Sequence, residues 1–171
     1  NVDARELAGD PWVDMDYGPT LTMSVEVAPD DIAYKGICVR LDRGSGGIAA
    51  GSAFAAFDTD TLRLAAAWSG EGFINWEGIH FNGEHGVHPG TVGETVVHNP
   101  VGPGWARPAD GNFVDSRLTG RDGKHYGPLD RQWAHFKGHY HHGQDVVFHY
   151  TVGTTKVLEM PSLEEGSLPL F

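Results

Sequence analysis

Histidines are the side chains in this sequence with the greatest capacity for chemistry, and they are clustered. Five of the ten histidines lie in residues 126–160 and three lie in residues 80–88. If residues 138–142 are extended, His139 and His141 point to the same face, where both imidazoles can reach one metal ion. His142 would then point to the opposite face. The spacing therefore predicts a pair of metal ligands.

Two alternatives to this pair remain open. A helix beginning near Trp133 would pair His135 with His139, one turn apart. The histidines could also make ordinary hydrogen bonds in loops. A catalytic Zn or Cu site needs three protein ligands and an open position, so a third ligand must come from elsewhere.

The glycine-rich residues 80–88 are the natural source of further ligands, because glycine lets the backbone fold tightly around an ion. Glu84 in this stretch is the best placed general base for a metal-bound water. No HExxH motif is present. The ligands predicted for Cu or Zn are His80, His85, His88, His139 and His141.

A second candidate site lies in residues 68–77, where Trp and Phe alternate with carboxyl and amide groups. This composition is typical of sites that stack sugar rings and hydrogen-bond their hydroxyls. The competing interpretation is a structural loop anchored by its tryptophans. The predicted contacts with a polysaccharide or oligosaccharide are Trp68, Glu71, Asn75, Trp76 and Glu77.

Asp58 and Asp60 could offer oxygen ligands to calcium, but they do not complete an EF-hand loop. Aspartates in turns more often cap local backbone groups, so we expect a structural role for this turn. A GxSxG nucleophile elbow and a phosphate-binding glycine motif are both missing from the sequence.

The elements that must position these residues are strands. Residues 20–27 alternate apolar and polar side chains, and residues 32–41, 53–57 and 62–68 follow as further strands. Residues 145–152 and 155–160 form a hairpin about Gly153-Thr154, and one helical turn is possible over residues 131–136. With 24 glycines and 10 prolines, the chain is expected to be all-β, an antiparallel, jelly-roll-like β-sandwich with long glycine-rich loops.

The pattern divides the chain into an N-terminal arm (1–19), one β-sandwich domain (20–160) and a C-terminal linker (161–171). Residues 69–130 are rich in glycine and proline with only brief apolar pieces. Loops of that length in a compact domain usually carry function, so we expect the site-forming loops here.

Charge and cysteine content exclude several classes of function. A formal net charge of −11 disfavours nucleic acid and anionic membrane surfaces. The single cysteine, Cys38, lies in an apolar run and is expected to be buried, so no internal disulfide forms. No apolar run approaches the roughly 18 residues of a membrane span, so no membrane insertion is expected.

Several ordered pieces of the sequence resemble a known bacterial domain. They are MDYGP at 15–19, IAYKGI at 32–37, AFDTDTLR at 56–63, GWA at 104–106, YGPL at 126–129, WAH at 133–135 and YTVG at 150–153. Together they resemble a domain of unknown function from very large exported proteins of Planctomycetes and Verrucomicrobia, commonly upstream of repeat and c-type cytochrome domains. The resemblance implies a periplasmic or secreted location and neighbouring domains in a larger polypeptide. It implies no established activity and no catalytic residues.

Two hypotheses of function follow. The first is a noncatalytic, extracytoplasmic β-sandwich module that binds carbohydrate or docks neighbouring domains. The alternative is a histidine-coordinated metalloenzyme that uses Cu or Zn to act on polysaccharide.

Overall fold

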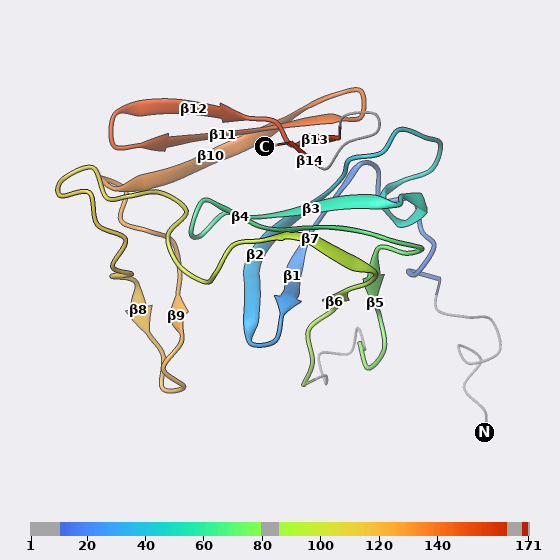
Figure 1. Cartoon of the computed structure of the whole chain (residues 1–171), viewed down its shortest axis with the longest axis horizontal. Helices are drawn as coiled ribbons and strands as arrows, with labels where there is room; N and C mark the ends of the chain where they lie inside the picture. Colours follow the sequence, from blue (N-terminus) through green and yellow to red (C-terminus); the bar gives the residue numbers. More distant parts are fainter. Residues whose placement is uncertain (1–10, 80–85, 164–168, 171) are drawn as a thin grey trace.

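The chain is all-β and has two layers. The computed structural model describes residues 11–79, 86–163 and 169–170, and these contain fourteen strands, one 3-10 turn and no α-helix. A curled seven-stranded sheet forms one layer, and a three-stranded sheet lies above it (Figure 1). The expected all-β, sandwich-like architecture is therefore confirmed.

The large sheet has the strand order β5-β6-β1-β2-β3-β4-β7. Its strands are β1 (Thr20–Ala28), β2 (Asp31–Arg40), β3 (Ala53–Asp58), β4 (Arg63–Ser69), β5 (Ile74–Asn75), β6 (Gly90–Thr91) and β7 (Glu94–His98). All neighbours are antiparallel except β1 and β6, which pair in parallel through Glu26 and Gly90. This one parallel contact makes the sheet mixed, whereas the sequence predicted a purely antiparallel one.

The small sheet has the order β10-β11-β12. Its strands are β10 (Ala134–His142), β11 (Asp145–Val152) and β12 (Thr155–Glu159). The remaining elements are the pair β8 (Leu118–Thr119) and β9 (His125–Tyr126), the pair β13 (Ser162–Leu163) and β14 (Pro169–Leu170), and the 3-10 turn η1 (Ile48–Ala50).

The six long strands predicted from the sequence fall within one or two residues of their observed bounds, and β11 and β12 turn about Gly153-Thr154 as predicted. The possible helical turn over residues 131–136 is wrong. Residues 131–133 form a hydrogen-bonded turn instead, in which the Trp133 and Ala134 amides donate to the Asp130 carbonyl, and β10 begins at Ala134. β10 is therefore extended as far as His142.

Strands β3 and β4 are apolar almost without interruption because both of their faces are covered. Ala55 and Phe57 face the small sheet, and Phe54 and Ala56 face the inside of the curl of the large sheet. The Phe57 ring stacks on Phe148 of β11, with centroids 4.3 Å apart. A strand buried on both faces needs continuous hydrophobicity rather than alternation, which accounts for the run AFAAF.

Cys38 is fully buried in the inner core of the curl, as its apolar surroundings predicted, and burial raises the pKa of its thiol to about 12. Among the described residues, no helix is long and apolar enough to span a membrane.

The contact between Phe57 and Phe148 predicts a large stability effect. We expect Phe57→Ala to lower the free energy of unfolding by about 3–5 kcal/mol, because it leaves a cavity between the two layers. Phe113→Ala is the matched control, since Phe113 is 57% exposed and its loss should cost well under about 1 kcal/mol. Urea denaturation of both variants measures the difference, and equal costs would contradict the layered core.

Candidate functional site

Buried charge is concentrated at the turn between β3 and β4. Arg63 is 3% exposed, and its guanidinium forms a bidentate pair with the Asp31 carboxylate. In this pair Nη1 donates to Oδ2 at 2.9 Å, and Nη2 donates to Oδ1. In the same turn, the Thr61 hydroxyl donates to Asp58 Oδ2 at 2.7 Å. Four of the five buried polar or charged side chains in the described part of the chain are these residues. The turn has the structural role expected of it, since Asp58 Oδ1 accepts a hydrogen bond from the Asp60 amide at 3.1 Å, and it also forms part of a buried polar network.

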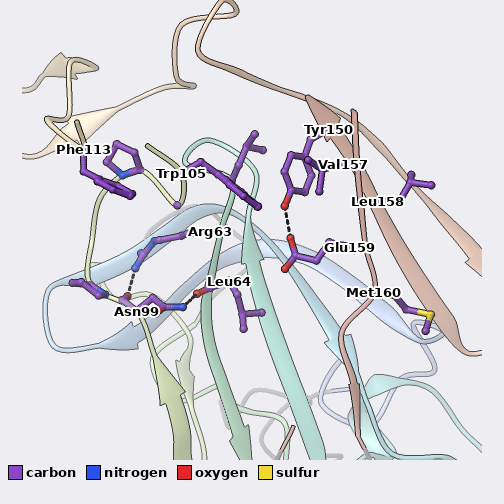
Figure 2. Close-up of a pocket in the computed structure, with 14 residues that line it drawn as sticks. Arg63, Leu64, Asn99, Trp105, Phe113, Tyr150, Val157, Leu158, Glu159 and Met160 are labelled. Atoms are coloured by element: carbon purple, nitrogen blue, oxygen red, sulfur yellow. Dashed lines mark hydrogen bonds between the residues drawn. The ribbon is translucent and has the colours of Figure 1, made fainter. Parts of the chain in front are cut away.

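The network reaches strand β7 and the loop that follows it. His98 Nε2 lies 2.9 Å from Asp31 Oδ2, and Arg63 Nη1 also donates to the Asn99 carbonyl. The side-chain amide of Asn99 donates to the Leu64 carbonyl at 2.8 Å. Two groups of Asn99, its backbone carbonyl and its side-chain amide, thus fix the loop after β7 to the start of β4 (Figure 2).

A glycine then brings this loop against the turn. The Gly104 amide donates to the Thr61 carbonyl at 2.9 Å. A Cβ atom at Gly104 would lie 2.2 Å from the Leu62 carbonyl oxygen, so no other residue fits. Leu62 itself has a φ of 52°, an unusual conformation for a buried, bulky residue. This close approach fixes the position of the next residue, Trp105.

Trp105 stands over a cavity of about 690 Å³ at the edge between the two layers, which we call the interlayer pocket. The large sheet and the loop after β7 form one side of it, and β12 forms the other (Figure 2). The side chains that line the pocket include Asn99, Trp105, Phe113, Tyr150, Leu158 and Glu159. Trp105 is 40% exposed and Phe113 57% exposed, so both rings are available to a ligand.

Side-chain contacts cross the pocket from one layer to the other. The Trp105 ring lies against the Tyr150 ring, with centroids 6.1 Å apart, and the Tyr150 hydroxyl donates to Glu159 Oε2 at 2.5 Å. β-Sheet register explains the contact, because Glu159 lies opposite Phe148 and Val157 opposite Tyr150, which places Glu159 and Tyr150 on the inward face. Burial raises the pKa of Glu159, and the Tyr150 hydrogen bond partly offsets this. The pocket thus combines two aromatic rings with one carboxyl group that holds its proton more tightly than usual.

Of the residues predicted to contact carbohydrate from 68–77, Trp68 is not accessible to a ligand. Trp68 is fully buried, and its indole N–H donates to the Phe73 carbonyl at 2.8 Å. The Asn75 side chain accepts a hydrogen bond from the Glu77 amide at 2.9 Å, which is a local turn contact. Glu71 is exposed, and Trp76 is half-buried against the inner core of the curl. The buried Trp68 thus fits the structural alternative, whereas carbohydrate contact by Glu71, Asn75, Trp76 and Glu77 stays a prediction.

The histidine pair predicted from the sequence is present. β10 is extended, and the His139 and His141 rings lie with centroids 5.0 Å apart on one face, while His142 points the other way. His135 is not part of the pair, since Lys137 Nζ lies 2.7 Å from its Nδ1. The alternative pairing of His135 with His139 on a helix is therefore wrong.

The two histidine groups do not converge in the described residues. His88 packs edge-on against Tyr34, with ring centroids 5.7 Å apart, beside residues that cover the inner core of the curl. β10 lies in the other layer (Figure 1). Among the described residues, no three His, Cys, Asp or Glu side chains gather closely enough to hold a metal ion. His80, Glu84 and His85 lie outside the described residues.

Sequence reasoning missed Trp105, Phe113 and Glu159. Trp105 and Phe113 do lie in the region 69–130, where site-forming loops were expected. Nothing in the local pattern distinguished these two aromatic residues from others in the same region. Glu159 was hidden because its partner, Tyr150, comes from the neighbouring strand through sheet register.

Comparison with known proteins gives one match. Residues 55–159, more than half of the chain, match the family model described as a domain of unknown function, DUF6797. No curated protein and no solved structure matches. The matched range contains the polar turn at Asp58 to Arg63, both pocket aromatics, Glu159 and the histidine pair. The expected resemblance to a domain of unknown function is confirmed at that level.

The pair of Arg63 with Asp31 predicts a stability cost that depends on burial. We expect Asp31→Ala to lower the free energy of unfolding by about 3–5 kcal/mol, because it leaves the buried Arg63 guanidinium with only the more distant Asp58 carboxylate, 3.9 Å from its Nε, as a charged partner. The control is Asp110→Ala, which breaks the exposed pair with Arg107 and should cost far less, because solvent screens that pair. Chemical denaturation of both variants measures this, and a cost for Asp31→Ala no larger than the control would contradict the network.

The raised pKa of Glu159 predicts how stability depends on pH. As pH rises through the ordinary glutamate range, the unfolded chain releases its proton before folded Glu159 does, so this group makes folding less favourable. Glu159→Gln removes that penalty and keeps an oxygen to accept the Tyr150 hydrogen bond. We therefore expect the stability of the variant, relative to wild type, to increase from pH 4 to pH 7 in urea denaturation. Glu94→Gln, at an exposed site on β7, is the control and should show no such trend.

Proposed function

The chain belongs to the DUF6797 family of domains of unknown function, and we propose that it is a noncatalytic module that binds a polysaccharide or oligosaccharide in the interlayer pocket. One observation carries the proposal: two exposed aromatic rings, Trp105 and Phe113, share a hollow with the half-buried carboxyl group of Glu159. Sugar rings present apolar faces that stack on aromatic side chains and hydroxyls that hydrogen-bond to carboxyl groups.

The size and rigidity of the pocket support this role. A volume of about 690 Å³ falls within the range of roughly 300–1,000 Å³ that small-molecule sites occupy. Trp105 is held on two sides, since its ring packs against Tyr150 with centroids 6.1 Å apart and its carbonyl accepts a hydrogen bond from Trp133 Nε1 at 3.1 Å. A preorganised ring loses little entropy when a ligand stacks on it.

The charge of the chain narrows the class of glycan. A formal net charge of −11 repels polyanionic chains, so the ligand is an uncharged or amino-substituted glycan rather than a uronic acid or sulfated polymer. Glu159 suits such a ligand, because its carboxyl group accepts hydrogen bonds from hydroxyl or amino groups when ionised and also donates one when protonated.

We also propose where this module is located and what it is attached to. The resemblance to domains of large exported proteins supports a periplasmic or secreted location and neighbouring domains in a longer polypeptide. In such a protein, a binding module would hold a catalytic or redox domain close to an insoluble polysaccharide. This tethering would raise the effective concentration of the polysaccharide at that domain.

Docking of a neighbouring domain is the second candidate for the same surface. β12 ends the three-stranded sheet, and Leu158 and Met160 beside it are 58% and 48% exposed. Sheet edges flanked by apolar side chains can accept an extended segment as an additional strand. The glycan proposal is preferred because docking does not use the pair of exposed rings or Glu159.

A Cu or Zn enzyme acting on polysaccharide is supported less well. It requires a third protein ligand near His139 and His141, and Glu84 as base. His88, the one predicted ligand from residues 80–88 that the structure describes, packs on Tyr34 beside the inner core instead.

Titration calorimetry with a panel of soluble neutral oligosaccharides tests the proposal. We expect a saturable ligand among them, and a loss of affinity of about tenfold or more in both Trp105→Ala and Phe113→Ala, because each removes a stacking face. The control is Leu118→Ala, which removes a 77% exposed apolar side chain that does not line the pocket. Its affinity should equal that of the wild type.

Three outcomes would contradict the proposal. Failure of every neutral glycan to bind would remove the carbohydrate class. Equal affinity in wild type, Trp105→Ala and Phe113→Ala would place the ligand outside the interlayer pocket. Loss of affinity only in Trp76→Ala would return the sugar site to residues 68–77.

A further inference from the structure

An irregularity in β10 decides which face of the small sheet His139 and His141 occupy. Before residue 137, Ala134 and Phe136 pair with Val152 and Tyr150 and pack toward the large sheet. The register then shifts by one residue between Phe136 and Gly138. Such a β-bulge exchanges the two faces of the strand for every residue that follows.

After the bulge, the odd-numbered residues face inward. His139 lies opposite Phe148 and His141 lies opposite Val146, and both of these partners are buried. Gly138, with a φ of 141°, adopts the backbone conformation that the bulge requires. The bulge therefore turns two imidazoles toward the layer side of the sheet, whereas Tyr140 and His142 point away from it.

The spacing of the two rings suits one metal ion. An imidazole nitrogen binds a transition metal at about 2.0–2.1 Å, which puts each ring centroid about 3.2 Å from the ion. Two adjacent ligands at angles between about 90° and 110° then have centroids about 4.5–5.3 Å apart. The observed separation of His139 and His141 is 5.0 Å.

The residues that lie opposite the pair on β11 are apolar. The inward-facing residues opposite the pair, Phe148 and Val146, offer no competing hydrogen-bonding groups.

Other histidines in the small sheet have different surroundings. His149 lies on the outer face, where it stacks on Tyr140 at 5.9 Å and its Nδ1 lies 3.2 Å from the Tyr140 hydroxyl. His142 lies opposite Asp145 on that same outer face. These two residues are therefore natural controls within the same hairpin.

We propose that His139 and His141 form a two-histidine site for a divalent transition metal ion that prefers imidazole, binding Cu²⁺ more tightly than Zn²⁺, with water in the remaining positions. Imidazole suits both ions, and affinity for a given nitrogen site is higher for Cu²⁺ than for Zn²⁺. The site is independent of glycan binding in the interlayer pocket, and neither Trp105 nor Glu159 takes part in it.

Titration of metal-stripped, untagged protein with CuCl₂, and separately with ZnCl₂, tests this proposal. We expect one saturable Cu²⁺ site, tighter than that for Zn²⁺, and a loss of Cu²⁺ affinity of at least about tenfold in both His139→Ala and His141→Ala. His142→Ala and His149→Ala should stay within about twofold of wild type. Electron paramagnetic resonance of the Cu²⁺ complex should show coupling to two imidazole nitrogens, and to one in either single variant.

The variants separate a chelating pair from general affinity of a histidine-rich chain. His141 is exposed, so its replacement should leave the fold intact, which thermal unfolding verifies in parallel. An equal loss of affinity in all four variants, no loss in any of them, or a loss in only one of His139→Ala and His141→Ala would overturn the site. Failure of the wild type to bind one equivalent of Cu²⁺ at micromolar concentration would overturn it as well.

Discussion

The buried pairing of Arg63 with Asp31 is the constraint around which this fold is arranged. A guanidinium and a carboxylate lose several kcal/mol of hydration when they leave water, and pairing with each other and with further polar groups offsets that loss. Nη1 and Nη2 of Arg63 are matched in this way, whereas its buried Nε has no hydrogen-bond partner. Here Asp31 begins β2, Arg63 begins β4, and the Asn99 carbonyl and His98 ring come from the end of β7. One ion pair therefore connects three parts of the large sheet at the same end, and the loop after β7 takes its position from it.

The loop after β7 connects this buried network to the candidate site, because it carries Trp105. Gly104 allows the loop to lie directly on the β3–β4 turn, and Trp105 then reaches across the gap to Tyr150 in the other layer. The layers separate at this edge, so the ring covers a hollow rather than filling a core. Polar groups lie on both sides of the hollow, with Asn99 and Arg63 on the large sheet and Glu159 on β12. The binding surface we propose is thus a product of how the two sheets meet.

The histidine pair depends on a different device, the β-bulge in β10. A regular strand would carry Ala134, Phe136, Gly138 and Tyr140 on one face and would leave His139 and His141 on the outer side. The extra residue at 137 reverses this arrangement without disturbing the core contacts of Ala134 and Phe136. Bulges commonly redirect side chains near functional sites, which is consistent with a ligand-binding role for the residues that this one reorients.

The sequence by itself determined the long strands, the hairpin about Gly153-Thr154, the buried cysteine and the shared face of His139 and His141, because each depends on alternation or burial within a few neighbouring residues. It could not determine which face of the sheet the histidine pair occupies, since the bulge leaves no pattern in composition. It also favoured Trp68 as a sugar contact, although the curl of the large sheet buries that ring completely. The pairing of Arg63 with Asp31 and that of Tyr150 with Glu159 join different strands. Only the tertiary structure decided these contacts, because strand order and register, rather than local sequence, set which distant side chains meet.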